Sequence, residues 1–563
     1  MIFVVDFGSQ TAHLIARRIR ESGIETEMVS PENAYGKATK EKPKGLIFSG
    51  GPASVYEKGA PTIDKKIFSL GIPILGICYG LQLTAHLLGG KVVAGRKEYG
   101  PATLKMKNER SKMKNKNFSS LIFHLSSKLP QQFIVWMSHG DEVVKLPERF
   151  EIIGSTEHVP FAFVENHNLK IIGLQFHPEV EHTEFGKQII KNFVEICSLS
   201  SVILGTQSEA WRTPESPTAM RDSGQARMTN VNKSVDTDKL IADIKTVVAD
   251  AYVIGAVSGG VDSTVAAYLT AKAIGKKLIP VYVDNGLMRV GTTGHVKNIF
   301  SKLNTSVKII NVQKEMLKKL KGVTDSEKKR KIIGRLYIEV FEKEMDKLIK
   351  QGKDVKFLLQ GTIYSDVIES GAPRSPADAS AKEDQGITHA SKIKSHHNVG
   401  GLPKGMKLKL LEPLRTFYKD EIREIGRQLG LPEEFVEKQV FPGPGYGIRI
   451  RGEVTSKRLK QEKMADEIIL EELEKNGLLD KVYMSFPVMS GTLSTAVKGD
   501  GRAFDEVIAL RIIESKDVMT STWARLPYDV LQKISSRIVN EVPNVSRVVY
   551  DITTKPPATM EWE

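Results

Sequence analysis

Residues 251–269, with the sequence AYVIGAVSGGVDSTVAAYL, constrain the fold more than any other stretch of the chain. An apolar strand from Ala251 to Val257 runs directly into a glycine-containing loop, and an apolar helix is expected from Thr264. Glycines let the backbone turn tightly and bring its N–H groups against a ligand. These amides and the positive end of the helix predict an anion site, suited to phosphate, at the strand-to-helix turn.

The loop differs from a Walker loop because it lacks the Gly-Lys-Ser/Thr ending. It offers hydroxyls and one carboxylate, which suit a pyrophosphate with Mg²⁺ beside it. The segment resembles the PP-loop of the ATP pyrophosphatases, which adenylylate a substrate oxygen and release pyrophosphate. The alternative is an ordinary glycine-rich turn. The resemblance implies ATP and Mg²⁺ as cofactors, Asp262 as the Mg²⁺ ligand, and these ATP contacts: Ser258, Gly259, Gly260, Val261, Asp262, Ser263, Thr264, Val283 and Gly361.

Length and composition favour a globular protein of several domains. The chain has 563 residues, of which 40% are hydrophobic and 26% charged. No apolar run approaches the roughly 20 residues of a membrane span, and the first residues show no basic segment of a signal peptide. Two cysteines, Cys78 and Cys197, cannot build a disulfide framework. We therefore expect a cytoplasmic protein without a membrane partner.

The net charge of +14 raises the question of nucleic-acid binding. The basic residues are spread along the chain, and the densest runs are residues 105–116 and 327–331. The first run lacks interleaved aromatic residues and is typical of a solvated hairpin or loop. We expect a preference for nucleotide substrates and no dedicated nucleic-acid partner.

The order of apolar runs predicts an α/β fold class with a C-terminal α+β domain. Residues 1–200 alternate strands with helical patterns, and residues 201–228 are rich in Ser, Thr, Pro and Gly, as in a linker. Residues 229–440 form a second α/β domain, with strands expected at 251–257, 278–283, 307–312 and 355–360. Within it, residues 371–392 predict a mobile loop. Residues 441–563 alternate helices (460–476, 527–541) with strands (481–486, 547–552).

Cys78 lies between two glycines, where a predicted strand (IPILGI) meets a predicted helix (LQLTAHLLG). This spacing resembles a nucleophile elbow with cysteine in place of serine. The helix N-terminus favours the thiolate, but the thiol still needs a base and a group that orients the base. His177 and Glu179 are two residues apart in a segment expected to be extended, so their side chains can point the same way. His177 is the predicted base and Glu179 its orienting group.

A third piece is Ser49-Gly50-Gly51-Pro52, whose amides can supply one arm of an oxyanion hole, at Gly51, with the Tyr79 amide as the other. In this order the pieces resemble the class I glutamine amidotransferases, whose Cys–His–Glu triad hydrolyses glutamine to glutamate and ammonia. The resemblance implies that Gln82, Ser138 and His139 help to hold glutamine. His139 and His182 could also be ordinary surface histidines, the reading we favour for His182. Cys197 lies in a helical pattern and is expected to be structural.

A glutaminase and an ATP pyrophosphatase complete one reaction, the ATP-dependent amination of an oxygen-bearing carbon. Later segments narrow the acceptor, because they closely resemble the glutamine-hydrolysing GMP synthase family over essentially the whole chain. The segments are KKRKIIGR at 328–335, QGTIYSDVIE at 360–369, KSHHNVGGLP at 394–403, FPGPG at 441–445 and KPPATMEWE at 555–563.

The resemblance implies amination of xanthosine monophosphate (XMP) at C2, with glutamine, XMP and ATP as substrates. It also implies that the third domain forms a homodimer. Lys394 would support adenylylation, and His396 and His397 lack a third ligand that spacing would place for a metal. The residues implied to bind XMP are Arg330, Lys498, Lys555, Met560 and Glu561, with Lys498 the weakest candidate.

Three other interpretations remain. A glutamine-dependent NAD synthetase would typically carry a nitrilase-type glutaminase instead of this elbow. A PP-loop enzyme that modifies tRNA should have an added RNA module or catalytic cysteines near the PP-loop, and no cysteine follows Cys197. A catalytically inactive scaffold conflicts with the intact Cys78, His177, Glu179 and Asp262.

Overall fold

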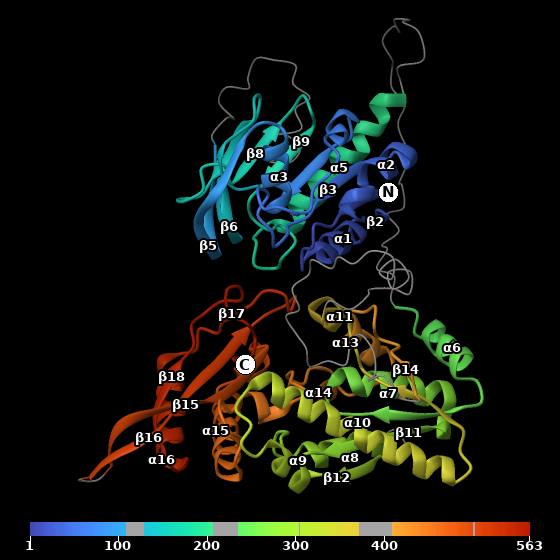
Figure 1. Cartoon of the computed structure of the whole chain (residues 1–563), viewed down its shortest axis with the longest axis vertical. Helices are drawn as coiled ribbons and strands as arrows, with labels where there is room; N and C mark the ends of the chain where they lie inside the picture. Colours follow the sequence, from blue (N-terminus) through green and yellow to red (C-terminus); the bar gives the residue numbers. More distant parts are fainter. Residues whose placement is uncertain (108–128, 206–234, 303–304, 371–407, 499–500) are drawn as a thin grey trace, which may run out of the picture. The chain divides into compact units, whose positions relative to one another are not determined.

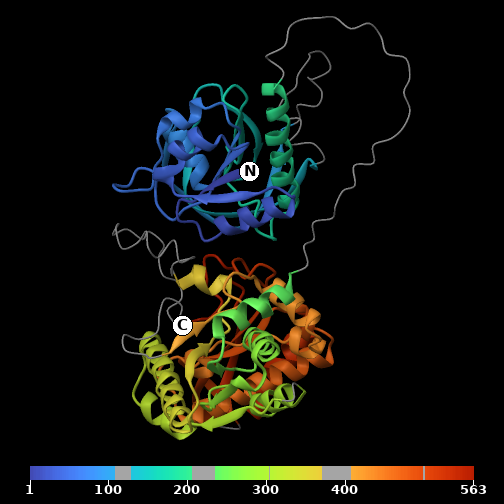
Figure 2. The same cartoon turned by 90° about the vertical axis from the view of Figure 1, so that its right-hand side faces the viewer.

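The computed structural model describes residues 1–107, 129–205, 235–302, 305–370, 408–498 and 501–563. The chain divides into two compact units, Met1–Lys233 and Ser234–Glu563. Figures 1 and 2 show them in two perpendicular views, and each unit has its own sheets and hydrophobic cores.

A nine-stranded mixed sheet forms the centre of the first unit, in the order β2-β1-β3-β4-β9-β8-β7-β5-β6. The parallel part contains β1 (Ile2–Val5), β2 (Thr26–Val29), β3 (Gly45–Phe48), β4 (Ile74–Ile77) and β9 (Ile171–Leu174). The antiparallel part contains β8 (Phe163–Asn166), β7 (Glu151–Ser155), β5 (Lys91–Met106) and β6 (Gln132–Lys145). The predicted α/β pattern with a mixed sheet is confirmed.

Helices cover both faces of this sheet because successive strand residues point to opposite sides. Ile2 and Val4 join one hydrophobic cluster, and Phe3 and Val5 join the other. The first cluster contains residues of α1 (Ala12–Glu21) and α5 (Gly186–Gly205); the second contains residues of α2 (Pro31–Glu41) and α3 (Tyr79–Leu87). The sheet is therefore the middle layer of three.

A parallel five-stranded sheet, in the order β12-β11-β10-β13-β14, forms the first part of the second unit. Its strands are β10 (Tyr252–Ala256), β11 (Leu278–Asp284), β12 (Lys308–Asn311), β13 (Val355–Leu359) and β14 (Lys409–Leu411). The four strands predicted here are confirmed. Its helices are α6 (Thr237–Val248), α7 (Val261–Ile274), α8 (Thr292–Lys302), α9 (Gln313–Leu320), α10 (Ser326–Lys350), α11 (Tyr364–Ser370), α13 (Lys419–Gln428) and α14 (Glu433–Val436).

The C-terminal part of the second unit is α+β, as predicted. Strand β16 (Gly501–Glu514) pairs with β15 (Met484–Lys498), β17 (Thr522–Trp523) and β18 (Val545–Tyr550). Helices α15 (Ser456–Lys475) and α16 (Tyr528–Glu541) pack against this sheet. In Figure 1 the β15–β16 hairpin extends away from the rest of the unit.

The hairpin corrects the prediction at two points. The strand expected at 481–486 continues to Lys498, and β16 was not predicted. The outer half of the hairpin is rich in small, polar and glycine residues and its side chains are largely exposed, so no buried apolar face marks it in the sequence. Backbone pairing between Leu493–Lys498 and Gly501–Glu506 holds it together instead.

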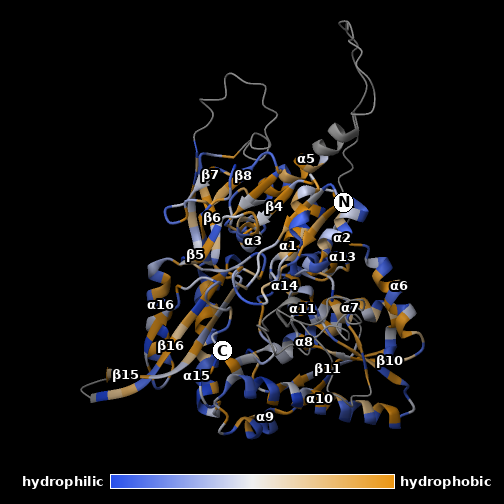
Figure 3. Ribbon diagram, turned by 45° about the horizontal axis from the view of Figure 1, so that its top comes forward, coloured by the Kyte–Doolittle hydropathy of each residue, from blue (hydrophilic) through white to orange (hydrophobic). Residues whose placement is uncertain are grey.

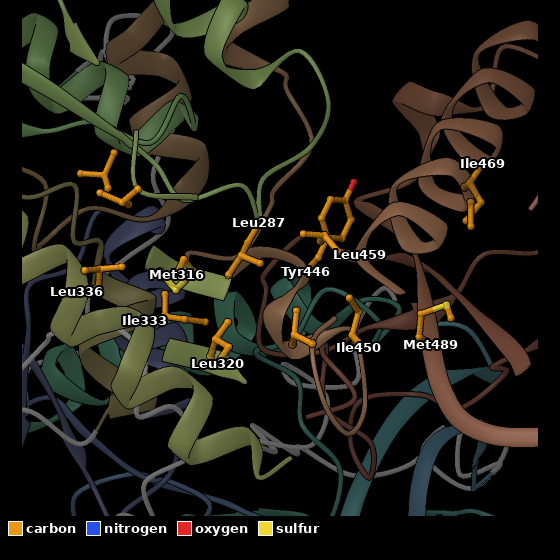
Figure 4. Packing of buried hydrophobic residues seen from close by; sticks show 14 of the residues in the cluster. Leu287, Met316, Leu320, Ile333, Leu336, Tyr446, Ile450, Leu459, Ile469 and Met489 are labelled. Carbon is orange, nitrogen blue, oxygen red and sulfur yellow. The ribbon is translucent and has the colours of Figure 1, made fainter. Parts of the chain in front are cut away.

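One hydrophobic cluster joins the five-stranded sheet to the C-terminal part. Figure 4 shows Leu287 and Ile333 on one side and Ile469 and Met489 on the other, with Tyr446 between them. Because this cluster crosses the expected domain boundary at 440/441, that boundary stays a prediction.

Figure 3 shows the strands of both units largely in orange, for hydrophobic residues, while the helices carry blue, hydrophilic stretches.

Several expected features lie partly or wholly outside the described residues. Helix α5 continues to Gly205, so the first residues of the expected linker are helical, and the remainder falls in 206–234. The loop expected at 371–392 and most of the basic run at 105–116 also lie outside the described residues. Within the described ranges, no helix is both long enough and apolar enough to cross a membrane.

Candidate active sites

Cys78 lies at the sharp turn between β4 and α3. It is the N-cap residue of α3, with φ of 50° and ψ of −104°, an unusual conformation for a residue with a side chain. The thiol is buried among polar groups: the Ser138 carbonyl lies 3.7 Å from Sγ, and the Gln175 amide nitrogen lies 3.6 Å from it. The predicted elbow geometry is therefore present, with the thiol at a helix N-terminus.

His177 and Glu179 meet beside this thiol. The His177 Nδ1 lies 2.8 Å from Glu179 Oε1, and the Thr11 hydroxyl donates to the same carboxylate oxygen at 2.6 Å. Both side chains are buried. The segment that carries them bends and turns after β9, so the expectation of an extended segment is wrong, although the side chains still converge.

Charge around His177 favours its protonated form. Burial would by itself lower the pKa of His177, but the Glu179 carboxylate and a hydrogen bond to Cys78 raise that pKa well above its ordinary value. The His177 backbone is also held, because its N–H donates to the Trp136 carbonyl at 3.0 Å and its carbonyl accepts from Thr183 Oγ1 at 2.6 Å. The imidazole is thus oriented between a thiol and a carboxylate, as a base for Cys78 requires.

The glycine pair after β3 approaches the same site. A Cβ atom on Gly50 would lie 3.2 Å from His177 Cε1, so Gly50 is directly beside the imidazole. Gly51 packs against the Phe7 backbone and the Tyr79 ring, where a Cβ atom would meet Phe7 O at 2.8 Å. Tyr79 begins α3, and the first amides of a helix have no partner within it. Gly51 and Tyr79 remain predicted oxyanion-hole residues.

The three residues predicted to hold glutamine gather near the thiol. Gln82 is buried on α3, and its amide nitrogen donates to the Asp141 carbonyl at 2.9 Å. His139 Nδ1 lies 3.0 Å from the same carbonyl, and its Nε2 lies 3.4 Å from Glu98 Oε2. Burial lowers the pKa of His139, against the opposing effect of Glu98. His139 is therefore not a surface residue, whereas His182 packs its ring 4.7 Å from that of Trp136.

The PP-loop lies where β10 ends and α7 begins, at the carboxyl edge of the parallel sheet. Hydroxyls fold the loop on itself: Ser263 Oγ lies 3.0 Å from Ser258 Oγ and donates to Gly260 O at 3.1 Å, and Thr264 Oγ1 donates to Gly260 O at 2.8 Å. These bonds hold the loop in place and leave first-turn amides of α7 available to an anion.

Two glycines set the shape of this loop. Gly259 has φ of 78°, and a Cβ atom there would meet Val296 Cγ2 at 2.7 Å. Gly361, after β13, lies so close to α7 that a Cβ atom would sit 2.7 Å from Ser263 N. The structure thus brings Gly361 to the PP-loop, as its predicted role requires. Val283 is buried in β11, one residue before that strand ends.

Asp262 has a cationic partner that the sequence analysis missed. The Lys419 Nζ lies 2.7 Å from Asp262 Oδ1 and 2.6 Å from Oδ2. Lys419 is the first residue of α13, which lies 157 positions further along the chain. The ion pair fixes the Asp262 carboxylate at the first turn of α7.

The C-terminal residues 555–563, here called the tail, are docked. Glu561 accepts two hydrogen bonds from Arg449, from Nε at 3.1 Å and from Nη2 at 3.0 Å. Arg449 is fully buried, and its guanidinium lies 3.7 Å from the Phe486 ring centroid. Met560 is buried in a small apolar cluster, and the Trp562 indole donates to Asp551 at 2.8 Å.

A second contact joins the tail to α10. Arg330 donates to the Glu563 carbonyl, and the fully buried Lys329 places Nζ 3.2 Å from Glu563 Oε2. Lys555 donates to the Val518 carbonyl at 3.0 Å. The structure thus brings Arg330 to the same tail that carries Lys555, Met560 and Glu561.

One residue predicted to bind XMP, Lys498, does not join this group. Lys498 ends β15 at the tip of the hairpin, which projects away from the end of the chain in Figure 1. Lys394 lies outside the described residues, as do His396 and His397. In the part of the chain that the structure describes, no three His, Cys, Asp or Glu side chains form a metal-binding group.

Comparison with known protein families gives three matches, each to a different segment of the chain. Residues 3–197 match the family described as glutamine amidotransferase class-I. Residues 233–335 match the NAD synthase family, and residues 471–562 match the GMP synthase C terminal domain.

Curated relatives match over the full length. GMP synthase (glutamine-hydrolyzing) of Aquifex aeolicus is 47% identical over 100% of this chain and 99% of its own length. The proteins of the same name from Caldicellulosiruptor saccharolyticus and Thermosipho africanus are 46% and 43% identical, each over 100% of this chain and 99% of its own length.

Proposed function

Because this chain belongs to the glutamine-hydrolysing GMP synthase family, with an amidotransferase domain and an ATP-using PP-loop domain, we propose that it converts XMP to GMP with ammonia from glutamine. The products are GMP, AMP, pyrophosphate and glutamate. The observation that carries the proposal is the presence in one chain of the Cys78–His177–Glu179 constellation and the PP-loop. We propose the cytoplasm as the place of action, from the cysteine content alone.

In the first half-reaction, Cys78 attacks the side-chain amide carbon of glutamine. His177 accepts the thiol proton and returns a proton to the departing ammonia, while Glu179 holds the imidazolium at 2.8 Å. The amides of Gly51 and Tyr79 stabilise the oxyanion, and Gln82, Ser138 and His139 help to hold the substrate. Water then releases glutamate from the thioester and restores the thiol.

In the second half-reaction, O2 of XMP attacks the α-phosphorus of ATP, and the bond to pyrophosphate breaks with its electrons leaving on pyrophosphate. Amides and hydroxyls of residues 258–264 hold the leaving group. Val283 and Gly361 complete the ATP site, and Lys394 supports the transfer. Ammonia then attacks C2 of the adenylylated XMP and expels AMP.

The residues present fit a Mg²⁺ ion that arrives with ATP. Asp262 places one carboxylate at the loop, and Mg²⁺ is typically bound by one or two carboxylates together with substrate phosphates. When bound, the ion would neutralise phosphate charge. Asp262 would hold it, after the carboxylate shares or exchanges its contact with Lys419.

The tail binds XMP in this proposal. Arg330 and Lys555 supply cations for the phosphate or the purine oxygens, Glu561 accepts hydrogen bonds, and Met560 supports the tail from its apolar cluster. Lys498 remains the least supported contact.

The exposed part of the β15–β16 hairpin supports a homodimer, with a second copy of this chain as the occupant. Leu493, Val497 and Phe504 expose 65%, 81% and 61% of their surface there. Apolar side chains gathered on a projecting element are typical of an interface. A sedimentation measurement on the full chain tests this proposal: a monomer at micromolar concentration would contradict it.

The reaction itself is tested by its stoichiometry. Glutamine, XMP and Mg·ATP should yield glutamate, GMP, AMP and pyrophosphate in equal amounts when all four are quantified in one sample. ADP and phosphate in place of AMP and pyrophosphate would contradict the PP-loop assignment.

A further inference from the structure

We propose that Lys438 is a further phosphate-binding residue of the PP-loop site and contacts the pyrophosphate part of ATP. This inference rests on the proposed function, because it assigns a ligand to the same loop. Lys438 lies in the segment between α14 and the FPGPG turn, far in sequence from the loop.

The Lys438 ammonium lies close to the PP-loop. The Lys438 Nζ lies 3.5 Å from the carbonyl oxygen of Gly259, so the ammonium reaches the PP-loop across 179 residues of sequence. The amide of the next residue, Gly260, belongs to the loop that is proposed to hold the leaving group. A phosphate oxygen bound by this loop would therefore lie within reach of a flexible lysine side chain.

Lys438 lacks a counter-charge: among the described residues, no carboxylate forms an ion pair with it. Neighbouring charges are engaged elsewhere: Arg289 pairs with Asp466 at 2.7 Å, and Lys302 pairs with Glu434 at 3.0 Å. Burial and the Arg289 guanidinium lower the pKa of Lys438 to about 8, so the amine still carries its proton at neutral pH. Lys438 is half-buried, and a partly desolvated cation without an anion gains stability when an anion arrives.

His295, whose pKa is affected by the Lys438 charge, is an uncharged neighbour and supplies no counter-charge. Its ring packs edge-on against Phe435 with 5.1 Å between centroids, and burial, followed by the Lys438 charge, lowers its pKa to about 4. His295 Nε2 is buried and has no hydrogen-bond partner in the described part of the chain. His295 also borders the PP-loop, because a Cβ atom on Gly259 would lie 3.9 Å from its Cδ2, so this nitrogen is available to a ligand of the loop.

The contrast with Lys419 sharpens the inference. Among the described residues two lysines reach the PP-loop, and Lys419 is neutralised by both oxygens of Asp262. Within the described part of the chain, the Lys438 ammonium has the Gly259 carbonyl oxygen as its hydrogen-bond partner, which leaves donor capacity for phosphate. We therefore expect Lys438 to contribute to the affinity for pyrophosphate and Lys419 to act through Asp262.

The test is direct titration of inorganic pyrophosphate with Mg²⁺ into the full chain, measured by calorimetry. K438M should raise the dissociation constant for pyrophosphate by about 10-fold to 100-fold, because one charge-assisted hydrogen bond is lost. K438R should keep most of the affinity, and K438Q provides a second neutral variant. K302M is the matched control, because it removes an equal charge nearby whose partner is Glu434.

The outcomes separate the two proposals. K438M and K438Q that bind pyrophosphate as tightly as the wild type, with unchanged melting temperatures, would overturn the role of Lys438. Equal weakening in K302M would also overturn it, because the effect would then be general charge. A wild-type chain that binds no pyrophosphate would overturn the PP-loop assignment itself.

Discussion

The Lys419 ammonium lies between the two carboxylate oxygens of Asp262, 2.7 Å from one and 2.6 Å from the other. This contact joins the first residue of α13 to the first turn of α7. It holds the carboxylate at the PP-loop, where we propose that Asp262 binds the Mg²⁺ ion that accompanies ATP.

D262N should abolish pyrophosphate release with either glutamine or ammonium as the nitrogen source. The amide cannot replace a charged ligand, and we expect a loss of more than about 100-fold, above the effect of altering a metal's outer partners. Pyrophosphate release in a coupled assay measures this. D250N is the control, because Asp250 forms an exposed pair with Lys277. Retained turnover in D262N would remove Asp262 from the Mg²⁺ role.

C78A should abolish glutamine-dependent GMP formation and leave ammonium-dependent formation intact. Loss of a nucleophile lowers such rates by about 10⁴-fold to 10⁶-fold. The matched control is C197A, because burial raises the pKa of the Cys197 thiol and keeps it protonated. If C78A lost both activities, the division of labour between the two domains would be wrong.

E179Q should change the pH dependence of Cys78 reactivity. The Glu179 carboxylate raises the pKa of His177, so the imidazolium persists at pH values above the ordinary histidine pKa of about 6.5. Without that carboxylate the pKa of His177 falls, and less imidazolium remains beside Cys78 at neutral pH. The rate of alkylation of Cys78 by iodoacetamide, followed across pH, should therefore drop near neutrality.

The sign of the accompanying stability change follows from linkage. A histidine with a raised pKa in the folded state stabilises that state fully below its unfolded pKa, and the stabilisation disappears as pH rises through the folded pKa. E179Q should reduce this contribution at low pH.

E181Q is the control for the alkylation measurement, because Glu181 pairs with Arg18 and Lys187 and not with His177. An alkylation profile identical to the wild type would contradict the assigned role of Glu179.

G361A should impair ATP binding without affecting the glutaminase. The added Cβ atom would sit 2.7 Å from Ser263 N and 2.8 Å from Ser263 Cα, so the backbone of α7 must move. We expect the KM for ATP to rise by about 10-fold. G294A is the control, since a Cβ atom there meets nothing within 4 Å. An unchanged KM in G361A would show that the loop tolerates displacement.

R449K should weaken XMP binding more than ATP binding. Lysine keeps the charge but cannot give the two parallel hydrogen bonds that hold Glu561 at 3.1 and 3.0 Å. We expect the KM for XMP to rise by about 10-fold and E561Q to have a similar effect. R537K is the control, because Arg537 pairs with Glu471 and Glu472 of α15 and Glu541 of α16 and does not contact the tail; it should leave both KM values unchanged. Equal changes for XMP and ATP in R449K would instead indicate a general structural role.

Local patterns predicted the pieces of both sites. The strand–loop–helix at 251–269 and the glycine-flanked Cys78 are short, so their geometry follows from neighbouring residues, and the structure reproduces both. His177 and Glu179 also converge, although the backbone between them turns. These features depend on contacts within a few positions.

Long-range partners could not be predicted from one sequence. Thr11 reaches Glu179 across 168 residues, Lys419 reaches Asp262 across 157, and Arg449 reaches Glu561 across 112. No periodicity or motif links such positions, since only the fold brings them together. The outer half of β16 carries no buried face and is held by backbone pairing, so its sequence gives no strand signal. Its inner half, residues 507–513, is an apolar run buried in the core, and this signal was overlooked.

The most direct test of the account is pyrophosphate release with Mg·ATP and ammonium chloride, comparing XMP with deamido-NAD as acceptor. The match of residues 233–335 to the NAD synthase family makes this the sharpest comparison. The account predicts release that depends on XMP and is absent with deamido-NAD. Release with deamido-NAD alone would contradict it and would show that the tail does not select XMP.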